Sequence, residues 1–222
     1  MRHTLDVIGL GRLALRALCL IAFASLSGCF GAQIHPTLHE RAISLRAGDL
    51  ESAGVAFITP STATGQEEEK QAVALIFAEA MKRERPRIPV VALAETLGAI
   101  NKSGLAEGYK RMYNDYRDTG LFERGILKQV GAATGSRYLA QLKLQRFSQG
   151  DKERFGALGL RIVETRFASV RLFFQIWDTR DGTIAWEGMQ EMLYAEDKVA
   201  EQPVTLQTMI DRTASDLIAH LP

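Results

Sequence analysis

The chain has 222 residues, of which 24% are charged, with 27 Lys and Arg against 26 Asp and Glu. Removing residues 1–28 takes away three arginines and one aspartate, which leaves 24 basic and 25 acidic side chains. A near-neutral chain lacks the basic excess on which non-specific nucleic-acid binding depends, so we expect no nucleic-acid partner.

The amino terminus has the three parts of an export signal. Arg2, Arg12 and Arg16 supply positive charge before and at the start of an apolar run from Ala17 to Leu26, and small residues follow. This order is typical of a secretory signal. The apolar run is about half of the ~20 residues that a membrane-spanning helix needs. We therefore predict a cleaved signal over residues 1–28.

The residues Leu26, Ser27, Gly28 and Cys29 close this segment and resemble the bacterial lipobox. The resemblance implies cleavage after Gly28 and a covalent lipid on Cys29. Lipoproteins of this class carry more than one acyl chain, which is what stable anchoring requires. Phe30 stands where an aspartate would favour retention in the inner membrane. The resemblance thus implies an outer-membrane lipoprotein that faces the periplasm.

Cysteine usage agrees with lipidation. Cys19 leaves with the signal, so Cys29 is the one cysteine that remains, and a lone thiol is a liability in an oxidising compartment. No disulfide is expected. Residues 30–50 lack clear periodicity, although Ile43, Leu45 and Leu50 suggest that the later part packs on the domain. We predict a lipid-anchored tether over residues 29–50 and a single α/β domain over residues 51–222.

The first half of the domain alternates strands and helices. A compact apolar run over residues 53–59 predicts a buried strand, and an apolar stripe of helical period predicts a helix that ends near Arg83. A second buried strand is predicted at 90–93. Three helices follow at about 94–101, 105–118 and 123–133.

The second half reads as an antiparallel meander followed by a helix. Strands are predicted at 138–147, 161–177 and 183–194, with a turn at 178–182 and a last helix that begins near Pro203. Alternation predicts one buried and one solvated face. The predicted inward residues are Tyr138, Ala140, Leu142, Leu144, Val170, Leu172, Phe174 and Ile176, and the predicted solvated ones are Gln141, Lys143 and Gln145. The class is α/β (α+β), a mixed sheet with a carboxyl-terminal antiparallel meander and helices packed against it.

Three segments carry a family resemblance: the strand 54–59 with its helix, the segment 131–139, and the hairpin 173–186. They resemble the periplasmic domain of curli-secretion (CsgG-like) lipoproteins, the TolB amino-terminal domain and outer-membrane activators of peptidoglycan synthases. The resemblance implies a protein-binding or assembly module of the cell envelope. The alternative that it implies is an oligomeric secretion-channel component of the curli-secretion type.

The channel alternative needs a hairpin that crosses a membrane. A membrane strand shows about ten residues of alternation with an apolar outer face. The insertion over residues 150–166 is the obvious candidate, but it holds seven charged residues: Asp151, Lys152, Glu153, Arg154, Arg161, Glu164 and Arg166. We therefore favour the binding module.

The sequence contains no familiar catalytic signature. His35 and His39 stand four apart, but Pro36 lies between them and the metalloprotease order is absent. There is no phosphate-binding loop and no nucleophile elbow. Asp178 and Asp181 fit a hairpin turn better than a calcium loop. We expect no enzyme activity, no metal and no cofactor apart from the lipid on Cys29.

One predicted helix is unusually aromatic. Tyr109, Met112, Tyr113 and Tyr116 follow the i, i+3, i+4, i+7 spacing of a single helix face. The simpler interpretation is a buried stripe. The alternative is a contact for a protein partner through Tyr109, Tyr113, Tyr116 and Arg117, because tyrosine and arginine are enriched in binding hot spots.

Replacing Cys29 by serine should release the protein from the membrane. The variant has no thiol to acylate, so the protein loses the lipid that holds it. Acyl labelling and membrane fractionation of the Cys29→Ser variant measure this. Unchanged labelling and membrane recovery would contradict the anchor.

Overall fold

The computed structural model describes residues 33–62, 67–157, 160–198 and 205–222. The predicted signal, its cleavage motif and Cys29 lie outside these residues. The strands are β1 (Gln33–Ala42), β2 (Val55–Phe57), β3 (Ser61–Thr62), β4 (Val90–Val91), β5 (Tyr138–Ala157), β6 (Leu160–Asp178) and β7 (Thr183–Lys198). The helices are α2 (Asp49–Ala53), α3 (Glu67–Glu84), α4 (Leu93–Lys102), α5 (Ala106–Thr119), α6 (Arg124–Thr134) and α7 (Leu206–Ala219).

These strands form one mixed sheet in the order β1-β7-β6-β5-β2-β4, with β3 also paired to β5. The antiparallel meander β5-β6-β7 and the helix after it are confirmed, and the strands run longer than predicted. β2 is parallel to both β4 and β5, as the intervening helices require. The predicted α/β class with a mixed sheet is therefore confirmed.

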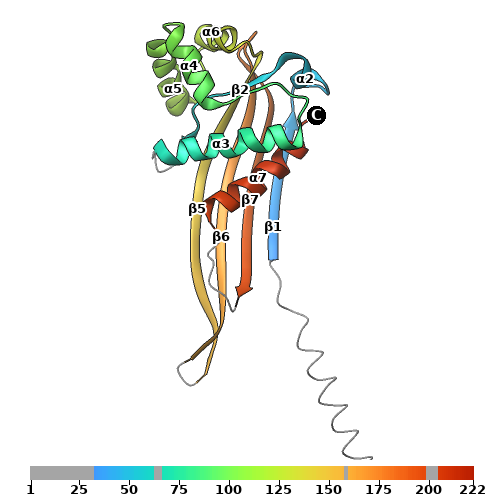
Figure 1. Cartoon of the computed structure of the whole chain (residues 1–222), viewed down its shortest axis with the longest axis vertical. Helices are drawn as coiled ribbons and strands as arrows, with labels where there is room; N and C mark the ends of the chain where they lie inside the picture. The colour runs from blue at the N-terminus through green and yellow to red at the C-terminus, as the bar shows by residue number, and fades with distance from the viewer. Residues whose placement is uncertain (1–32, 63–66, 158–159, 199–204) are drawn as a thin grey trace, which may run out of the picture.

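Helices cover the two faces of the sheet unequally. α3 and α7 lie across one face, while α4, α5 and α6 gather at one end of the sheet (Figure 1). Tyr138 packs with α3 and α7, whereas its neighbour Leu139 packs with α4, α5 and α6, so the two groups of helices lie on opposite faces. No helix in the described ranges is long and apolar enough to cross a bilayer.

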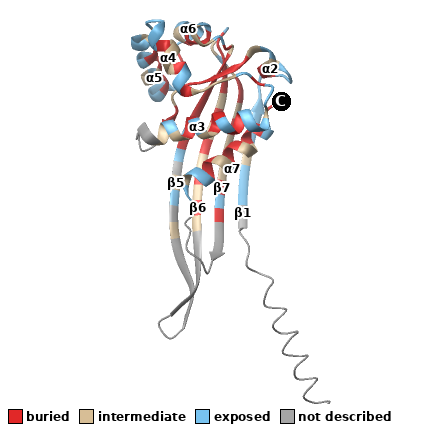
Figure 2. Ribbon diagram, in the orientation of Figure 1, coloured by how far each residue is buried: buried red, intermediate tan, exposed pale blue. Residues whose placement is uncertain are grey.

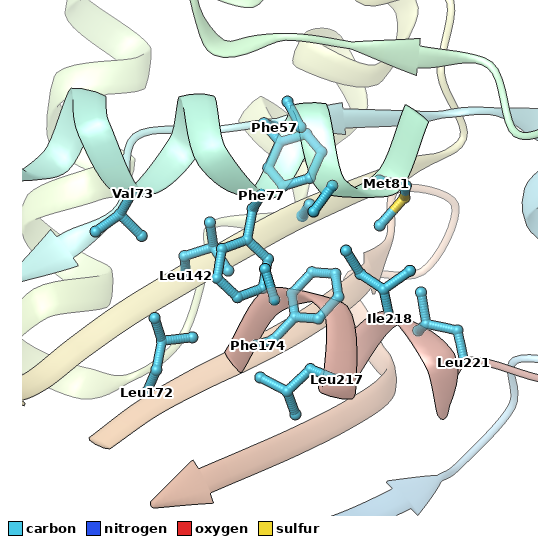
Figure 3. Packing of buried hydrophobic residues seen from close by; sticks show 14 of the residues in the cluster. Phe57, Val73, Phe77, Met81, Leu142, Leu172, Phe174, Leu217, Ile218 and Leu221 are labelled. Atoms are coloured by element: carbon cyan, nitrogen blue, oxygen red, sulfur yellow. The ribbon is translucent and has the colours of Figure 1, made fainter. Parts of the chain in front are cut away.

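The larger core lies beneath α3 and α7. Val170, Leu172, Phe174 and Ile176 are all buried, as predicted, and α3 supplies Phe77 from its apolar stripe. The Phe174 ring meets two other rings edge-on, with centroids 5.4 Å from that of Phe77 and 5.4 Å from that of Trp186. Figure 3 shows Phe77 and Phe174 facing each other between the helix and the strands. Burial concentrates where helices overlie the strands (Figure 2).

The predicted turn between β6 and β7 is present and needs no cation. Asp181 accepts hydrogen bonds from the backbone N–H of Thr183, at 2.9 Å, and from its hydroxyl. Gly182 has φ of +77°, which a residue with a side chain adopts only at a cost. Asp178 is buried, and its carboxylate accepts hydrogen bonds from the guanidinium of Arg137. These bonds support the hairpin-turn interpretation.

The predicted tether is wrong over most of its length. Residues 33–42 form β1, which pairs antiparallel with β7 from Gln33 opposite Ala195 to Ala42 opposite Trp186. Leu45 and Leu50 are buried in the main core, as expected for the later part of this segment. Local patterning missed β1 because it is an edge strand, whose backbone pairing is non-local and whose side chains are mostly exposed. Within the described residues, the domain therefore begins at residue 33, not 51.

Gln141 is a second correction. It was predicted on a solvated face with Lys143 and Gln145, which are indeed exposed. Gln141 itself is only 1% exposed. The face alternates as predicted, but the end of it that carries Gln141 lies under the α4, α5 and α6 cap, and only the remainder meets solvent.

Replacing Phe174 by alanine should lower the free energy of unfolding by about 3–5 kcal/mol, because it empties the centre of the main core. The neighbouring Phe173→Ala variant is the control, since Phe173 lies on the other face and is half-buried. Urea unfolding measures both. Equal midpoints would show that the two faces are assigned wrongly. Gln175 is no silent control, because its side-chain oxygen accepts hydrogen bonds from Tyr116 and Trp177.

Candidate functional site

The tyrosines of α5 fasten this helix to the sheet. The Tyr109 hydroxyl accepts a hydrogen bond from the backbone N–H of Thr59 at 2.8 Å and donates one to the Thr59 hydroxyl at 2.9 Å. One helical turn further on, the Tyr113 hydroxyl donates to the carbonyl of Pro60 at 2.8 Å. All three hydrogen bonds reach the segment that links β2 to β3. They fix the position of α5 relative to the strands, which is why the stripe is aromatic and not aliphatic.

Tyr116 is as buried as Tyr109 and packs among other rings. Its ring stacks on Phe122, with centroids 4.2 Å apart and planes 11° apart, and meets Trp177 edge-on. Its hydroxyl donates to Gln175 at 3.1 Å. Burial, with a smaller contribution from Tyr113, raises the pKa of Tyr116 from 10.0 to about 12. The group therefore stays neutral across the physiological range.

A pocket opens where the carboxyl-terminal half of α5 meets the uncovered part of the sheet. Its volume is about 510 Å³. Four of its side chains are cationic: Lys70 from α3, Arg117 from α5, Lys143 from β5 and Arg171 from β6. We call this site the basic pocket. The remaining lining residues are Ser61, Thr62, Tyr113, Tyr116, Gly120, Leu144 and Gln145.

The cations of the basic pocket are only partly neutralised. Arg171 donates to Glu191 on the neighbouring strand at 2.5 Å. Arg117 lies 3.6 Å from Asp118, and both side chains are more than 60% exposed, so this contact contributes little. Lys143 is exposed and has no ion pair within the described ranges. The pocket thus holds a surplus of positive charge.

The floor and wall of the pocket are held by polar contacts. The buried Gln141 amide donates to the Ser61 hydroxyl at 3.1 Å and to the Leu142 carbonyl at 3.1 Å. The Lys70 ammonium lies 5.7 Å from the centre of the Tyr113 ring, within cation–π range. These contacts fix Ser61 and Tyr113 at the wall.

The arrangement suits an anion. Lysine and arginine side chains bind carboxylates by charge-assisted hydrogen bonds, and arginine can do so with two parallel bonds. The tyrosine hydroxyls are already engaged, so the exposed Lys143 and Arg117 are the groups best placed to meet a ligand. Among the described residues, no cluster of three or more potential metal ligands occurs. His35 and His39 lie exposed on β1 and do not line the pocket.

The structure separates the predicted contact residues into two groups. Tyr113, Tyr116 and Arg117 line the basic pocket, whereas Tyr109 does not and serves the packing of α5. Tyr109 and Tyr116 are each 8% exposed, so the core interpretation holds for both. Lys143, on the face of β5 that was predicted to be solvated, also lines the pocket.

Sequence reasoning missed Lys70 and Arg171. Arg171 alternates with Val170 and Leu172 along β6, and this period already signalled that it leaves the core face. Lys70 lies in the first turns of α3. Nothing local shows that either residue would stand beside α5, because the pocket joins four separate elements.

No protein-family model and no curated protein matches this sequence. Solved structures with a similar arrangement include a dodecamer of a PelC variant from Paraburkholderia phytofirmans, at 11% identity, covering 84% of this chain and 97% of that chain with a TM-score of 0.45. A lipoprotein from Neisseria meningitidis has 12% identity over 75% and 98% of the two chains and a TM-score of 0.43. The LpoB carboxyl-terminal domain from Salmonella enterica has 13% identity over 63% and 82%, at 0.35. A bacterial lipoprotein is thus among the neighbours, but similarity at this level carries no argument about function.

Stability should fall between about pH 10 and pH 12 because of Tyr116. Its pKa is raised in the folded chain, so in that range the unfolded chain loses a proton that the folded chain keeps. The slope for one such group reaches about 1.4 kcal/mol per pH unit. Urea unfolding of the natural protein and of Tyr116→Phe at several pH values isolates this difference, since all other groups are shared. Parallel curves for the two proteins would contradict a buried, neutral Tyr116.

Proposed function

We propose that this protein is an outer-membrane-anchored lipoprotein that faces the periplasm and binds an envelope protein at the basic pocket. The observation that supports the proposal is the pocket itself, which gathers Arg117, Lys143 and Arg171 beside two tyrosines. Arginine and tyrosine are enriched in the residues that dominate protein interfaces. The role is that of a binding or assembly module of the cell envelope.

Binding, and not turnover, is the activity that this chemistry favours. The cations can position an anion, but the histidines that could take a proton lie elsewhere: His35 and His39 on β1, and His220 at the end of α7. The proposal includes no cofactor apart from the covalent lipid on Cys29. The proposed partners are the membrane, through that lipid, and one protein, through the basic pocket.

The anchor also orients the proposed module. Three residues separate Cys29 from Gln33, the first residue of β1, and an extended chain spans at most about 3.6 Å per residue. The start of β1 would then lie within about 14 Å of the lipid attachment. The α4, α5 and α6 cap lies toward the other end of the sheet from the start of β1, and β5 and β6 extend past that start in the direction away from the cap (Figure 1). The cap would project away from the membrane, with the basic pocket partway along the sheet.

A channel component is the second candidate. One observation favours it. The edge of β5 that faces away from β6 pairs with β2 and β3, and the pairing with β3 stops at Leu144 although β5 continues to Ala157. The far part of β5 therefore has an open backbone edge within the described residues, to which another copy could add a strand. Light scattering of the protein in detergent separates a monomer from a ring.

Partner capture in cells should depend on the basic pocket. A photoreactive p-benzoylphenylalanine in place of Gln145, which lines the pocket, reports the partner without relying on lysine chemistry. Lys143→Ala and Arg117→Ala should each cut the cross-linked product, with a loss typical of hot spots, about 2 kcal/mol or more. Both side chains are exposed, so folding should be unaffected.

Matched controls are Lys128→Ala on α6 and Arg111→Ala on α5, two exposed cations outside the pocket. They should leave the cross-link unchanged. An undiminished product in the Lys143→Ala, Arg117→Ala double variant would remove the pocket from the interface.

A further inference from the structure

The sheet face that carries the basic pocket continues toward β1, and no helix of the described residues covers this part of it. Alternation places the side chains of Lys143 on β5, Arg171 and Phe173 on β6, and Met189 and Glu191 on β7 on this face. It is the face opposite to α3 and α7 (Figure 1). We call it the open face.

The open face has a second hollow beside the basic pocket, with a volume of about 270 Å³. Phe173 and Met189 stand directly opposite each other on β6 and β7 at its centre, and both are half-buried. The other lining residues are His39, Glu40, Arg41, Glu187 and Gly188. Arg171, which lines the basic pocket, is two residues from Phe173 on the same strand and the same face. The two hollows are therefore neighbours.

The two hollows differ in chemistry. The basic pocket has a surplus of cations, whereas the second hollow exposes an aromatic ring and a thioether. Methionine and aromatic side chains are enriched in the buried centres of interfaces. A ligand that filled both hollows would need an anionic group at one end and an apolar group at the other.

We infer that the ligand is an extended protein segment that places an acidic side chain in the basic pocket and an apolar side chain over Phe173 and Met189. The inference rests on the proposed function and specifies its partner. Two strand spacings separate Lys143 on β5 from Met189 on β7, which is about 10 Å. An extended segment advances about 3.3 Å per residue, so the acidic and apolar residues stand two to four positions apart.

Two carboxylates on the open face make a uniform polyanion a poorer fit than a segment with one acidic residue. Glu187 lines the second hollow, and Glu191 lies on β7 beside Arg171. An acidic polysaccharide or nucleic acid crossing this face would meet both carboxylates. A segment with a single acidic residue places that charge beside Lys143 and Arg117 and its apolar residue over Phe173 and Met189, so it brings fewer like charges to this face.

Selection of peptides tests the inference. A display library of random twelve-residue peptides is panned against the mature protein, purified from membranes in detergent. The selected peptides should share an Asp or Glu two to four residues from a Leu, Ile, Phe or Met. Binding of the synthesised peptides is then measured by fluorescence anisotropy for the natural protein and five variants.

Lys143→Ala and Met189→Ala should each raise Kd at least tenfold. The controls Lys128→Ala and Leu193→Ala should change it less than twofold, since Leu193 is half exposed on the same strand as Met189 but outside both hollows. Added salt should weaken the Lys143 contribution and spare that of Met189. A peptide with lysine in place of its acidic residue should bind the Lys143→Glu variant more tightly than it binds the natural protein.

Several results would overturn the inference while leaving the in-cell cross-link at the basic pocket intact. They are an absence of selected peptides, selected peptides without an acidic residue, and binding that is indifferent to Met189→Ala. Polygalacturonate that binds with the same dependence on Lys143 would assign the pocket to a polyanion instead. Concentration-dependent dimers abolished by Met189→Ala would assign the open face to a second copy of this chain.

Discussion

Long antiparallel strands force every side chain to one face or the other, and the two faces of this sheet are covered to different extents. α3 and α7 lie across one face, so β5, β6 and β7 place Leu142, Phe174 and Trp186 there. On the other face the cap of α4, α5 and α6 reaches only one end. The basic pocket lies where that cap stops. It exists because the helical cover is shorter than the strands.

This boundary explains the double role of the tyrosine helix. Tyr109 and Tyr116 use their hydroxyls to bond Thr59 and Gln175, so they hold α5 in place instead of reaching a ligand. In doing so they bring Arg117 over the exposed end of the sheet. Packing and the proposed recognition are thus assigned to neighbouring residues of one helix. Under that proposal, substituting a tyrosine here disturbs both, whereas substituting an exposed cation disturbs only recognition.

The sequence predicted most helices and strands because their signals are local. The alternation of β6 and the apolar stripe of α3 can be read over a dozen residues, and both proved correct. The edge strand β1 could not be read in this way, since its main stabilising feature is backbone pairing with residues 186–195. Gln141 looked solvated because its burial depends on a cap folded from residues 93–134. The pocket escaped prediction for the same reason, because Lys70 and Arg171 meet only in the folded chain.

The pairing of β1 with β7 also sets an order of folding. β1 begins at Gln33, but its partner residues extend to Ala195, so the two strands lie more than 140 residues apart in the chain. A chain that emerges from its amino terminus carries β1 unpaired until nearly all of the domain has appeared. Non-local contacts of this kind form slowly and leave strand edges exposed meanwhile. If the predicted signal exports the chain, β1 therefore stays unpaired until β7 has emerged, and its open backbone edge can be captured by a chaperone meanwhile.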